Sequence, residues 1–170
     1  MREPPPYLGI AILTFVTLQR LAELIYARRN ERRLKARGAR EHAPGHYWLL
    51  VTLHGLWLTG LWLLAVQEPV NLAWFAAFVA LQGLRLWVLV TLKERWTTRI
   101  VVVPAAPLVE TGPYRFMSHP NYAIVAGEIF VLPMAFGLYA YAIVFSLLNA
   151  AILRMRIQAE NRALRLPPEQ

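Results

Sequence analysis

The sequence predicts an all-α integral membrane protein with five transmembrane helices. Of its 170 residues, 57% are hydrophobic and only 16% are charged, and the mean hydropathy is +0.38. Several apolar runs approach the roughly 20 residues that span a bilayer core. Basic residues gather between these runs. No change of composition divides the chain, so we expect a single membrane-embedded domain over residues 1–170.

The first three helices are predicted at apolar runs of spanning length, residues 7–26, 47–66 and 72–92. The next apolar run, residues 122–153, is too long for one crossing at about 1.5 Å per residue. Pro133 and Gly137 interrupt it, because proline lacks a backbone donor and glycine relaxes a helix. We therefore expect two short helices, the fourth and the fifth, joined as a tight hairpin.

The distribution of basic residues tests the number of helices. Lys and Arg crowd residues 28–40, 93–115 and 154–165, whereas only Arg2 precedes the first apolar run. By the positive-inside rule the N-terminus is outside, and the basic segments and the C-terminus are cytoplasmic, which requires an odd number of crossings. The net charge of +8 then reflects topology and contact with anionic membrane lipids, so nucleic acid is not an expected partner.

Four charged residues and one histidine lie inside the apolar runs, where each is costly unless it is paired or hydrated. Arg20 and Glu23, three residues apart, are expected to pair and to reach toward the membrane interface. Arg85 either reaches the interface or presents a positive charge to a buried cavity. Glu128 is expected to face a polar cavity or to pair with Arg85. For His54 we expect a hydrogen-bonded contact between helices.

The stretch before the fourth helix is polar at its end. Residues 96–109, rich in valine, predict an irregular segment along the membrane face, and residues 111–113 predict a turn. Pro120 suits the first position of a helix, which makes His119 its cap. With Arg115 nearby, this helix N-terminus is a candidate site for a carboxylate or another anion. The alternative is an interfacial turn anchored by Tyr and Arg.

Other chemistry is excluded by what the sequence lacks. The chain contains no cysteine, which excludes disulfides, thiolate metal sites and cysteine nucleophiles. No pair of His or Glu residues has the spacing of a known ligand motif, so we expect no metal. There is no phosphate-binding glycine loop and no nucleophile elbow.

Two motifs at the end of the chain carry a family resemblance. Residues 108–122 read Leu-Val-Glu-Thr-Gly-Pro-Tyr-Arg-Phe-Met-Ser-His-Pro-Asn-Tyr, and residues 156–164 read Arg-Ile-Gln-Ala-Glu-Asn-Arg-Ala-Leu. In this order, on either side of a helical hairpin, they resemble the isoprenylcysteine carboxyl methyltransferase family of integral membrane enzymes. Residues 30–39, 96–101 and 119–122 are similar to its short bacterial branch, some of whose members O-methylate alkylpyrones or alkylresorcinols.

The resemblance implies transfer of a methyl group from S-adenosylmethionine to an oxygen of a lipophilic small-molecule or prenylated acceptor. The oxygen would belong either to a carboxylate, as in a prenylcysteine, or to a phenol or hydroxypyrone. It also implies a bacterial cytoplasmic membrane, with the active site facing the cytoplasm. The motif regions, residues 96–122 and 154–165, would form the cofactor site. By similarity, the cofactor-binding residues would be Gly112, Pro113, Tyr114, Arg115, His119, Pro120, Tyr122, Arg156, Glu160 and Leu164.

The acceptor determines which catalytic groups are needed. A carboxylate is already anionic, whereas a phenol needs its proton removed, which makes Glu128 or His119 the candidate base and Arg85 a candidate catalytic cation. Two other functions remain open. One is N-methylation of a phospholipid amine, and the other is a non-catalytic scaffold or transport subunit that binds lipid.

The chain departs from the family pattern at four positions. Ser118 stands where the family usually has arginine, and Asn161 replaces a second glutamate. Ile124 replaces a common glycine, and Ala106 lies where eukaryotic relatives carry histidine. The missing cation at position 118 would weaken cofactor binding unless Arg115 or Arg156 compensates for it.

Overall fold

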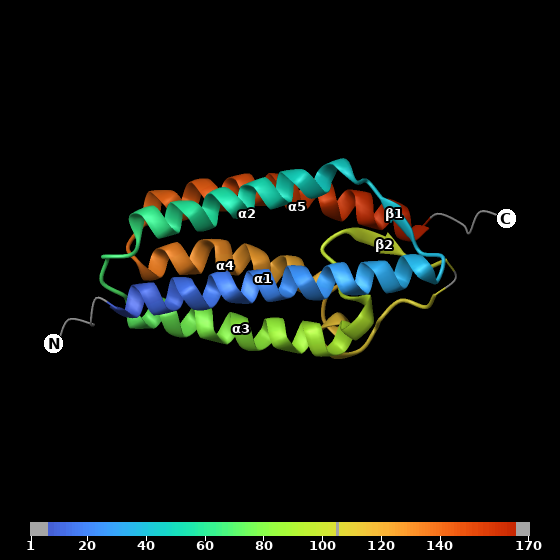
Figure 1. The fold of residues 1–170 in the computed structure, drawn as a ribbon, viewed down its shortest axis with the longest axis horizontal. Helices are drawn as coiled ribbons and strands as arrows, with labels where there is room; N and C mark the ends of the chain where they lie inside the picture. Colours follow the sequence, from blue (N-terminus) through green and yellow to red (C-terminus); the bar gives the residue numbers. More distant parts are fainter. Residues whose placement is uncertain (1–6, 105, 166–170) are drawn as a thin grey trace.

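The five α-helices of the described residues lie along a common long axis (Figure 1). The computed structural model describes residues 7–104 and 106–165. The helices are α1 Tyr7–Ala36, α2 Gly45–Leu64, α3 Leu72–Leu92, α4 Pro120–Ala135 and α5 Tyr139–Arg165. Four of them are long and apolar enough to cross a membrane, whereas α4 has only 16 residues. The all-α prediction with five helices is thus confirmed for the described residues, and the prediction that all five cross the membrane stays a prediction.

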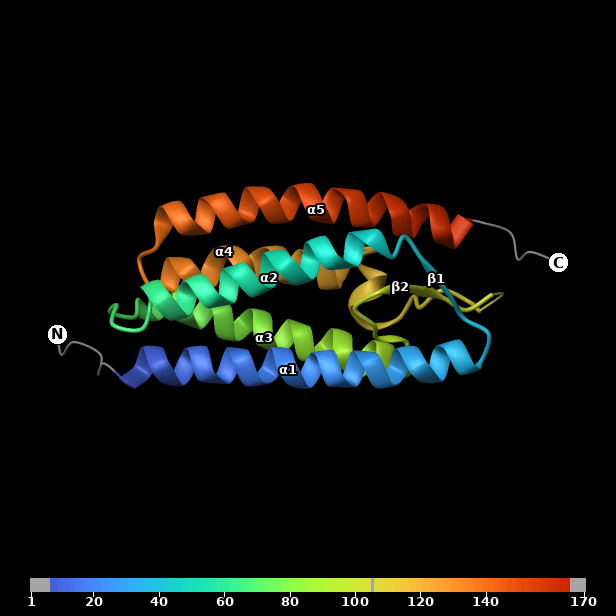
Figure 2. The same ribbon diagram turned by 45° about the horizontal axis from the view of Figure 1, so that its top comes forward.

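Successive helices run in opposite directions, so their connections gather at two ends of the bundle (Figures 1 and 2). The loop from α2 to α3 and the turn from α4 to α5 lie at one end, here called the far end. The connection from α1 to α2, the long segment from α3 to α4 and the last turns of α5 lie at the other end. We call this second end the motif end, because both family motifs reach it.

The first three helices follow the apolar runs closely. Helix α3 spans the predicted residues, and α2 begins and ends two residues earlier than predicted. Asn71 caps α3, because its Oδ1 accepts hydrogen bonds from the backbone N–H groups of Ala73 and Trp74 at 3.0 and 3.3 Å. Helix α1 continues ten residues beyond the apolar run, since the Lys and Arg residues that follow are good helix formers.

The predicted hairpin forms at the predicted break. Gly137 adopts φ 71°, a left-handed conformation that glycine reaches without strain, and its N–H donates to the Met134 carbonyl at 3.1 Å. The expectation of two short helices was wrong for the second one. Helix α5 has 27 residues, because no helix breaker stands between its apolar part and the motif at residues 156–164.

A short antiparallel ribbon at the motif end was not predicted. Strand β1 (Arg40–His42) pairs with strand β2 (Ile100–Val102), and Glu41 lies opposite Val101. The Glu41 carboxylate accepts hydrogen bonds from the Lys35 ammonium and from the Arg99 guanidinium, each at 2.6 Å. The expectation of a wholly irregular segment over residues 96–109 was therefore wrong, because the loop after α1 supplies a partner strand.

Two apolar clusters form the core, and each occupies one part of the bundle. The larger cluster lies toward the far end and includes Leu13, Trp57 and Ile129. The smaller cluster lies toward the motif end and contains Ala27, Val88, Trp96 and Ile124.

On α1, Arg20 and Glu23 lie between residues of the two clusters, and on α3 Gln82 and Arg85 do. On α4, Glu128 lies between Val125 and Ile129, which both belong to the larger cluster. Together these side chains form a polar layer within the core.

Candidate active site

Four charged side chains from three helices form an ion cluster, which we define as Arg20, Glu23, Arg85 and Glu128. Arg20 is partly exposed, and the other three are buried. Arg85 binds Glu23 through two hydrogen bonds, Nε to Oε1 at 2.5 Å and Nη2 to Oε2 at 2.7 Å. Its Nη1 donates to Glu128 Oε2 at 2.6 Å. Arg20 donates to the same Glu128 oxygen at 2.7 Å and to Glu23 Oε2 at 3.0 Å. Each carboxylate thus binds both guanidiniums.

The ion cluster tests the predictions made for the four charged residues of the apolar runs. The pairs of Arg20 with Glu23 and of Glu128 with Arg85 are confirmed. The expectation that Arg20 and Glu23 reach the membrane interface was wrong, and Arg85, only 4% exposed, does not reach it either. Two positive and two negative charges cancel, and each is hydrogen-bonded, which makes burial in a membrane helix bundle tolerable.

Two glutamines complete the polar layer. Gln82 Nε2 donates to the second oxygen of Glu128 at 2.8 Å, and Gln19 Nε2 donates to Gln82 Oε1 at 2.7 Å. Sequence reasoning missed both side chains. Their spacing is the signal that could have found them, because Gln82 lies three residues before Arg85 and Gln19 lies four residues before Glu23, on the same helix faces.

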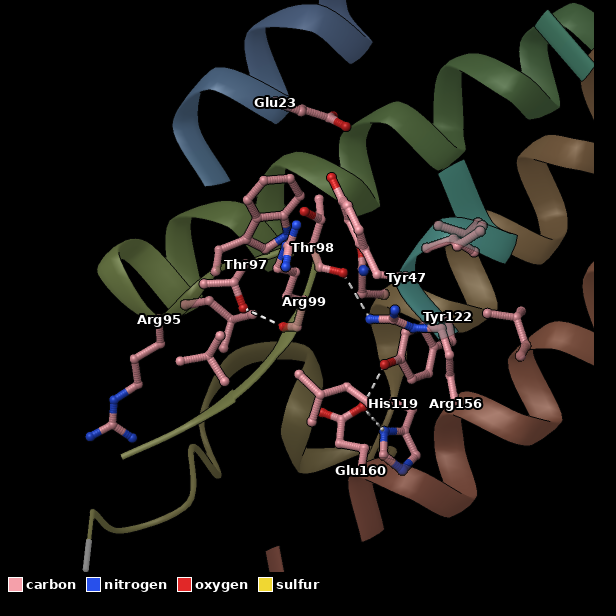
Figure 3. A pocket seen from close by; sticks show the side chains of 18 of the residues that line it. Glu23, Tyr47, Arg95, Thr97, Thr98, Arg99, His119, Tyr122, Arg156 and Glu160 are labelled. Atoms are coloured by element: carbon pink, nitrogen blue, oxygen red, sulfur yellow. Dashed lines mark hydrogen bonds and ion pairs between the residues drawn. The ribbon is translucent and has the colours of Figure 1, made fainter. Parts of the chain in front are cut away.

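A cavity of about 1090 Å³ runs from the ion cluster to the motif end. Arg20, Glu23 and Arg85 line its deep part. Leucine, valine and tryptophan line its middle: Leu24, Leu50, Val51, Trp96 and Val125. Polar side chains of the two motifs line its mouth. In Figure 3, Glu23 lies on one side of the cavity and Glu160 on the opposite side. The cavity therefore joins two polar ends through an apolar middle.

Helices α4 and α5 place the motif side chains together at the mouth. The Tyr122 hydroxyl donates to Glu160 Oε2 at 2.5 Å, and His119 Nδ1 lies 3.7 Å from the same oxygen. The imidazole also stacks on the Tyr122 ring with centroids 5.4 Å apart. Pro120 begins α4 and His119 is its cap residue, as predicted, although the His119 side chain makes no capping hydrogen bond.

Arg156 is the buried cation of the mouth. Its side chain reaches across from α5 to donate to the Thr98 carbonyl at 2.9 Å, and its guanidinium carbon lies 5.8 Å from the centre of the Tyr122 ring. Arg156 is only 4% exposed, and its Nε has no hydrogen-bond partner among the described residues. Asn121 Oδ1, on another residue that lines the cavity, is equally unpaired within the described parts of the chain.

The segment after α3 closes one side of the mouth. The Arg99 guanidinium lies 4.3 Å from the centre of the Tyr47 ring. Asn30 on α1 fixes the start of the segment, because its Nδ2 donates to the carbonyls of Lys93 and Trp96 at 3.0 and 2.9 Å. Asn30 lies in a basic stretch that suggests solvent exposure, so sequence reasoning missed it. Its spacing of three residues from the buried Ala27 is the available signal.

The predicted cofactor-binding residues divide into two groups. Those that line the cavity are Tyr114, Arg115, His119, Tyr122, Arg156, Glu160 and Leu164. Gly112, Pro113 and Pro120 instead shape the backbone. Gly112, at φ 60°, begins the short 3-10 helix Gly112–Arg115. Burial raises the pKa of Tyr114 to about 12, and the Glu160 carboxylate adds to the effect.

The predicted catalytic residues lie at different depths. His119 is at the mouth, Arg85 is in the deep wall, and Glu128 lies behind Arg20 and Arg85 and is not part of the cavity lining. His54 lines the deep part of the cavity. The expectation of a hydrogen bond between helices was wrong, because His54 Nδ1 donates to the Leu50 carbonyl one turn earlier in the same helix, at 2.9 Å. No group of three metal-ligating side chains occurs in the described parts of the chain.

The four departures from the family pattern also have places in the structure. Asn161 Oδ1 lies 3.2 Å from His119 Nε2, so the amide supports the imidazole. Ile124 is buried in the smaller apolar cluster. Ser118 and Ala106 line the mouth. Two other arginines, Arg115 and Arg156, line the same cavity and carry the positive charge that position 118 lacks.

Apolar helices of spanning length around a cavity with a polar mouth and an apolar middle define a class of helical membrane protein. The model of the "Isoprenylcysteine carboxyl methyltransferase (ICMT) family" matches residues 73–166. The chain belongs to this family of membrane methyltransferases, whose members use S-adenosylmethionine. It is also 39% identical over 158 residues to the Bacillus subtilis (strain 168) "Uncharacterized protein YpbQ", covering 90% of this chain and 94% of that protein. No solved structure matches it significantly.

Proposed function

We propose that this protein transfers a methyl group from S-adenosylmethionine to an oxygen of a lipophilic acceptor at the cytoplasmic face of the membrane. One observation carries the proposal. A single cavity of about 1090 Å³ joins the motif side chains at the mouth to an apolar interior. An enzyme that brings a charged, water-soluble donor to a membrane-dissolved acceptor needs this combination.

The side chains of the mouth fit the cofactor. Arg156, with its unpaired Nε, and Arg115 would hold the methionine carboxylate. Glu160 would hold the ammonium group or the ribose hydroxyls, and the Tyr122 ring would lie against the sulfonium or the adenine. When bound, the cofactor supplies an electrophilic methyl group. The missing arginine at position 118 is compensated, in this proposal, by Arg156.

The chain's own contribution is to orient the acceptor and to exclude water. Leu24, Leu50, Val51 and Leu58 form apolar walls that suit a long hydrocarbon tail. Holding the acceptor oxygen in line with the methyl group replaces a bimolecular encounter by a positioned one. The buried walls also keep water, a competing nucleophile, away from the donor.

Glu128 and Arg85 act in this proposal as positioning residues and not as acid or base. Both Glu128 oxygens already accept hydrogen bonds, from Arg20, Arg85 and Gln82, and the residue does not line the cavity. His119 does line it and lies beside Glu160. A proton that leaves the acceptor near the mouth would therefore go to His119.

Calorimetric binding of S-adenosylmethionine to the detergent-purified protein tests the proposal. Glu160→Ala and His119→Ala should each weaken binding by about tenfold to a hundredfold, because each variant removes a hydrogen-bonding side chain from the cofactor site. Glu68→Ala is the matched control, since this exposed glutamate lies in the far-end loop and should leave affinity unchanged.

The alternative functions make different predictions for S-adenosylmethionine binding and for transfer of its methyl group. A lipid-binding scaffold would not bind S-adenosylmethionine in either detergent or lipid. A phospholipid amine methyltransferase would bind it but would transfer label from the methyl group to phosphatidylethanolamine. Equal binding by wild type, Glu160→Ala and His119→Ala would contradict the proposed site.

A further inference from the structure

The outer side of α1 changes from apolar to basic where the helix reaches the end of its apolar run. Leu18 and Ile25 are 61% and 69% exposed, and Arg28, Arg29 and Arg32 follow them along the helix and are exposed as well. The apolar run of about 20 residues measures about 30 Å at 1.5 Å per residue, which equals the thickness of a bilayer core. The three arginines therefore begin in the headgroup layer at the motif end.

These side chains lie on one side of α1, away from the rest of the bundle. At about 3.6 residues per turn, they fall within about 100° of the helix circumference. Figure 2 shows α1 along one edge of the bundle, and Glu23, Ala27, Asn30 and Leu34 are buried on its inner side. We call the outer side the outer stripe and define it by its exposed members: Leu18, Leu21, Ile25, Arg28, Arg29 and Arg32.

The three arginines of the outer stripe have no hydrogen-bond or ion-pair partner among the described residues. Two carboxylates near this part of α1 bind other cations. Glu31 accepts a hydrogen bond from Lys35 Nζ at 2.6 Å, and Glu94 accepts one from Arg37 Nη1 at 2.9 Å. Three positive charges are thus left without a neutralising group in the described parts of the protein. A phosphate suits them, because a guanidinium binds phosphate oxygens through two parallel hydrogen bonds.

Helix α5 offers a comparison, because its exposed side also changes from apolar to basic. Leu147 and Leu148 are exposed there, and Arg154 and Arg162 follow. These two arginines are about 12 Å apart along the helix axis, whereas the three of the outer stripe lie within about 6 Å. This spacing concentrates more positive charge around one phosphate group on α1 than on α5.

We propose that the outer stripe binds an anionic phospholipid of the surrounding membrane, such as phosphatidylglycerol. The lipid phosphate accepts hydrogen bonds from the three arginines, and the acyl chains lie along the three apolar side chains. Phosphatidylcholine suits the stripe less well, because its quaternary ammonium group cancels the charge of its phosphate. A soluble phosphate lacks the acyl chains that the apolar part contacts. The inference goes beyond the proposed methyl transfer and does not depend on it, since Arg28, Arg29 and Arg32 do not line the cavity.

Native mass spectrometry of the full-length protein in detergent tests the stripe. The protein is titrated with dioleoyl phosphatidylglycerol or with dioleoyl phosphatidylcholine, which differ only in the headgroup. Wild type should bind the first phosphatidylglycerol about tenfold more tightly than phosphatidylcholine, because each arginine near the headgroup layer attracts an anionic lipid. The triple variant Arg28→Gln, Arg29→Gln and Arg32→Gln should bind the two lipids equally.

Further controls separate the stripe from net charge, from folding and from a soluble anion. The triple variant Arg37→Gln, Arg154→Gln and Arg162→Gln removes the same number of charges outside the stripe and should keep the preference. Both triple variants should unfold at the wild-type temperature, because the replaced side chains are exposed. Glycerophosphoglycerol, the same headgroup without acyl chains, should not displace bound phosphatidylglycerol at equal concentration.

Equal affinity of wild type for the two lipids, or a preference that survives in the variant of Arg28, Arg29 and Arg32, would overturn the inference. An equal loss of preference in both triple variants would overturn it too, because net charge alone would then explain the binding. Displacement by glycerophosphoglycerol would reveal a site for a soluble anion instead of a lipid. The proposed function fails by another result, the absence of S-adenosylmethionine binding at the mouth, which leaves the lipid preference unchanged.

Discussion

At the scale of single residues, the ion cluster is the feature on which the membrane-embedded core depends. Arg20 and Glu23 come from α1, Arg85 from α3 and Glu128 from α4, so their hydrogen bonds join three helices. Two guanidiniums balance two carboxylates. Removing one partner leaves a buried charge uncompensated, which costs far more than the net value of an intact pair.

Arg85→Met should therefore destabilise the protein by about 3–5 kcal/mol, measured as a lower midpoint of thermal unfolding in detergent. The double variant Arg85→Met with Glu128→Leu should be more stable than Arg85→Met alone, because Arg20 and Glu23 remain as a balanced pair. Arg37→Met is the matched control, since the exposed Arg37 pairs with Glu94 at the surface and contributes under about 1 kcal/mol. A double variant less stable than both single variants would contradict a charge-balance role.

The sequence predicted part of this cluster, and the limit has a physical cause. Spacing along one helix revealed Arg20 with Glu23, and the cost of burying Glu128 pointed to Arg85 as its partner. The bonds from Arg85 to Glu23 and from Arg20 to Glu128 depend on how three helices are rotated against one another. That rotation follows from packing of the whole bundle. For the same reason, His54 could not be predicted as part of a cavity wall.

At the scale of elements, helices were predictable and the ribbon was not. Apolar runs of about twenty residues predicted the ends of α1, α2 and α3 to within two residues, except for the C-terminal end of α1. That end lies in the basic stretch that follows the apolar run. Strands β1 and β2 have three residues each, too few for a period to be detected. The ribbon also depends on charges, because Glu41 joins Lys35 and Arg99. Burial favours the protonated carboxyl, but these hydrogen bonds outweigh it and lower the pKa of Glu41.

This lowered pKa gives the ribbon a pH dependence whose sign is fixed. A carboxyl with a depressed pKa in the folded state stabilises above its ordinary pKa of about 4.3, and that contribution is lost as pH falls. At pH 7, ribbon amides in Glu41→Gln should exchange with deuterium about fivefold faster than in wild type. The ratio should approach one as pH falls below 4.3, and Glu68→Gln should show no effect. If the ratio of the two exchange rates did not change with pH, the charge of Glu41 would not stabilise the ribbon.

At the scale of the whole molecule, the arrangement of the two ends indicates how the protein lies in a membrane. Every described Lys and Arg other than Arg20 and Arg85 belongs to the half of the bundle toward the motif end. The far-end loop and turn contain one charged residue, Glu68. Helix α4, about 24 Å long at 1.5 Å per residue, begins deeper in the bundle than α1 and α5 end (Figure 1). The mouth is therefore recessed between longer helices.

This asymmetry predicts a cytoplasmic motif end and an external far end. The chain has no cysteine, so a single introduced cysteine is the only thiol of the protein that a maleimide can label. In intact cells, a membrane-impermeant maleimide should label Glu68→Cys in the far-end loop. It should label Met117→Cys, an exposed position at the motif end outside the cavity lining, only after the membrane is permeabilised.

The labelling result also bears on function, because S-adenosylmethionine is dissolved in the cytosol and the mouth lies at the motif end. Labelling of Met117→Cys alone in intact cells would invert the orientation and separate the mouth from the donor, which contradicts the proposed methyl transfer. Labelling of both positions would place both ends outside, which an odd number of crossings forbids. Only the predicted pattern lets a cytosolic donor enter the mouth while the apolar cavity middle stays at the depth of the membrane-dissolved acceptor.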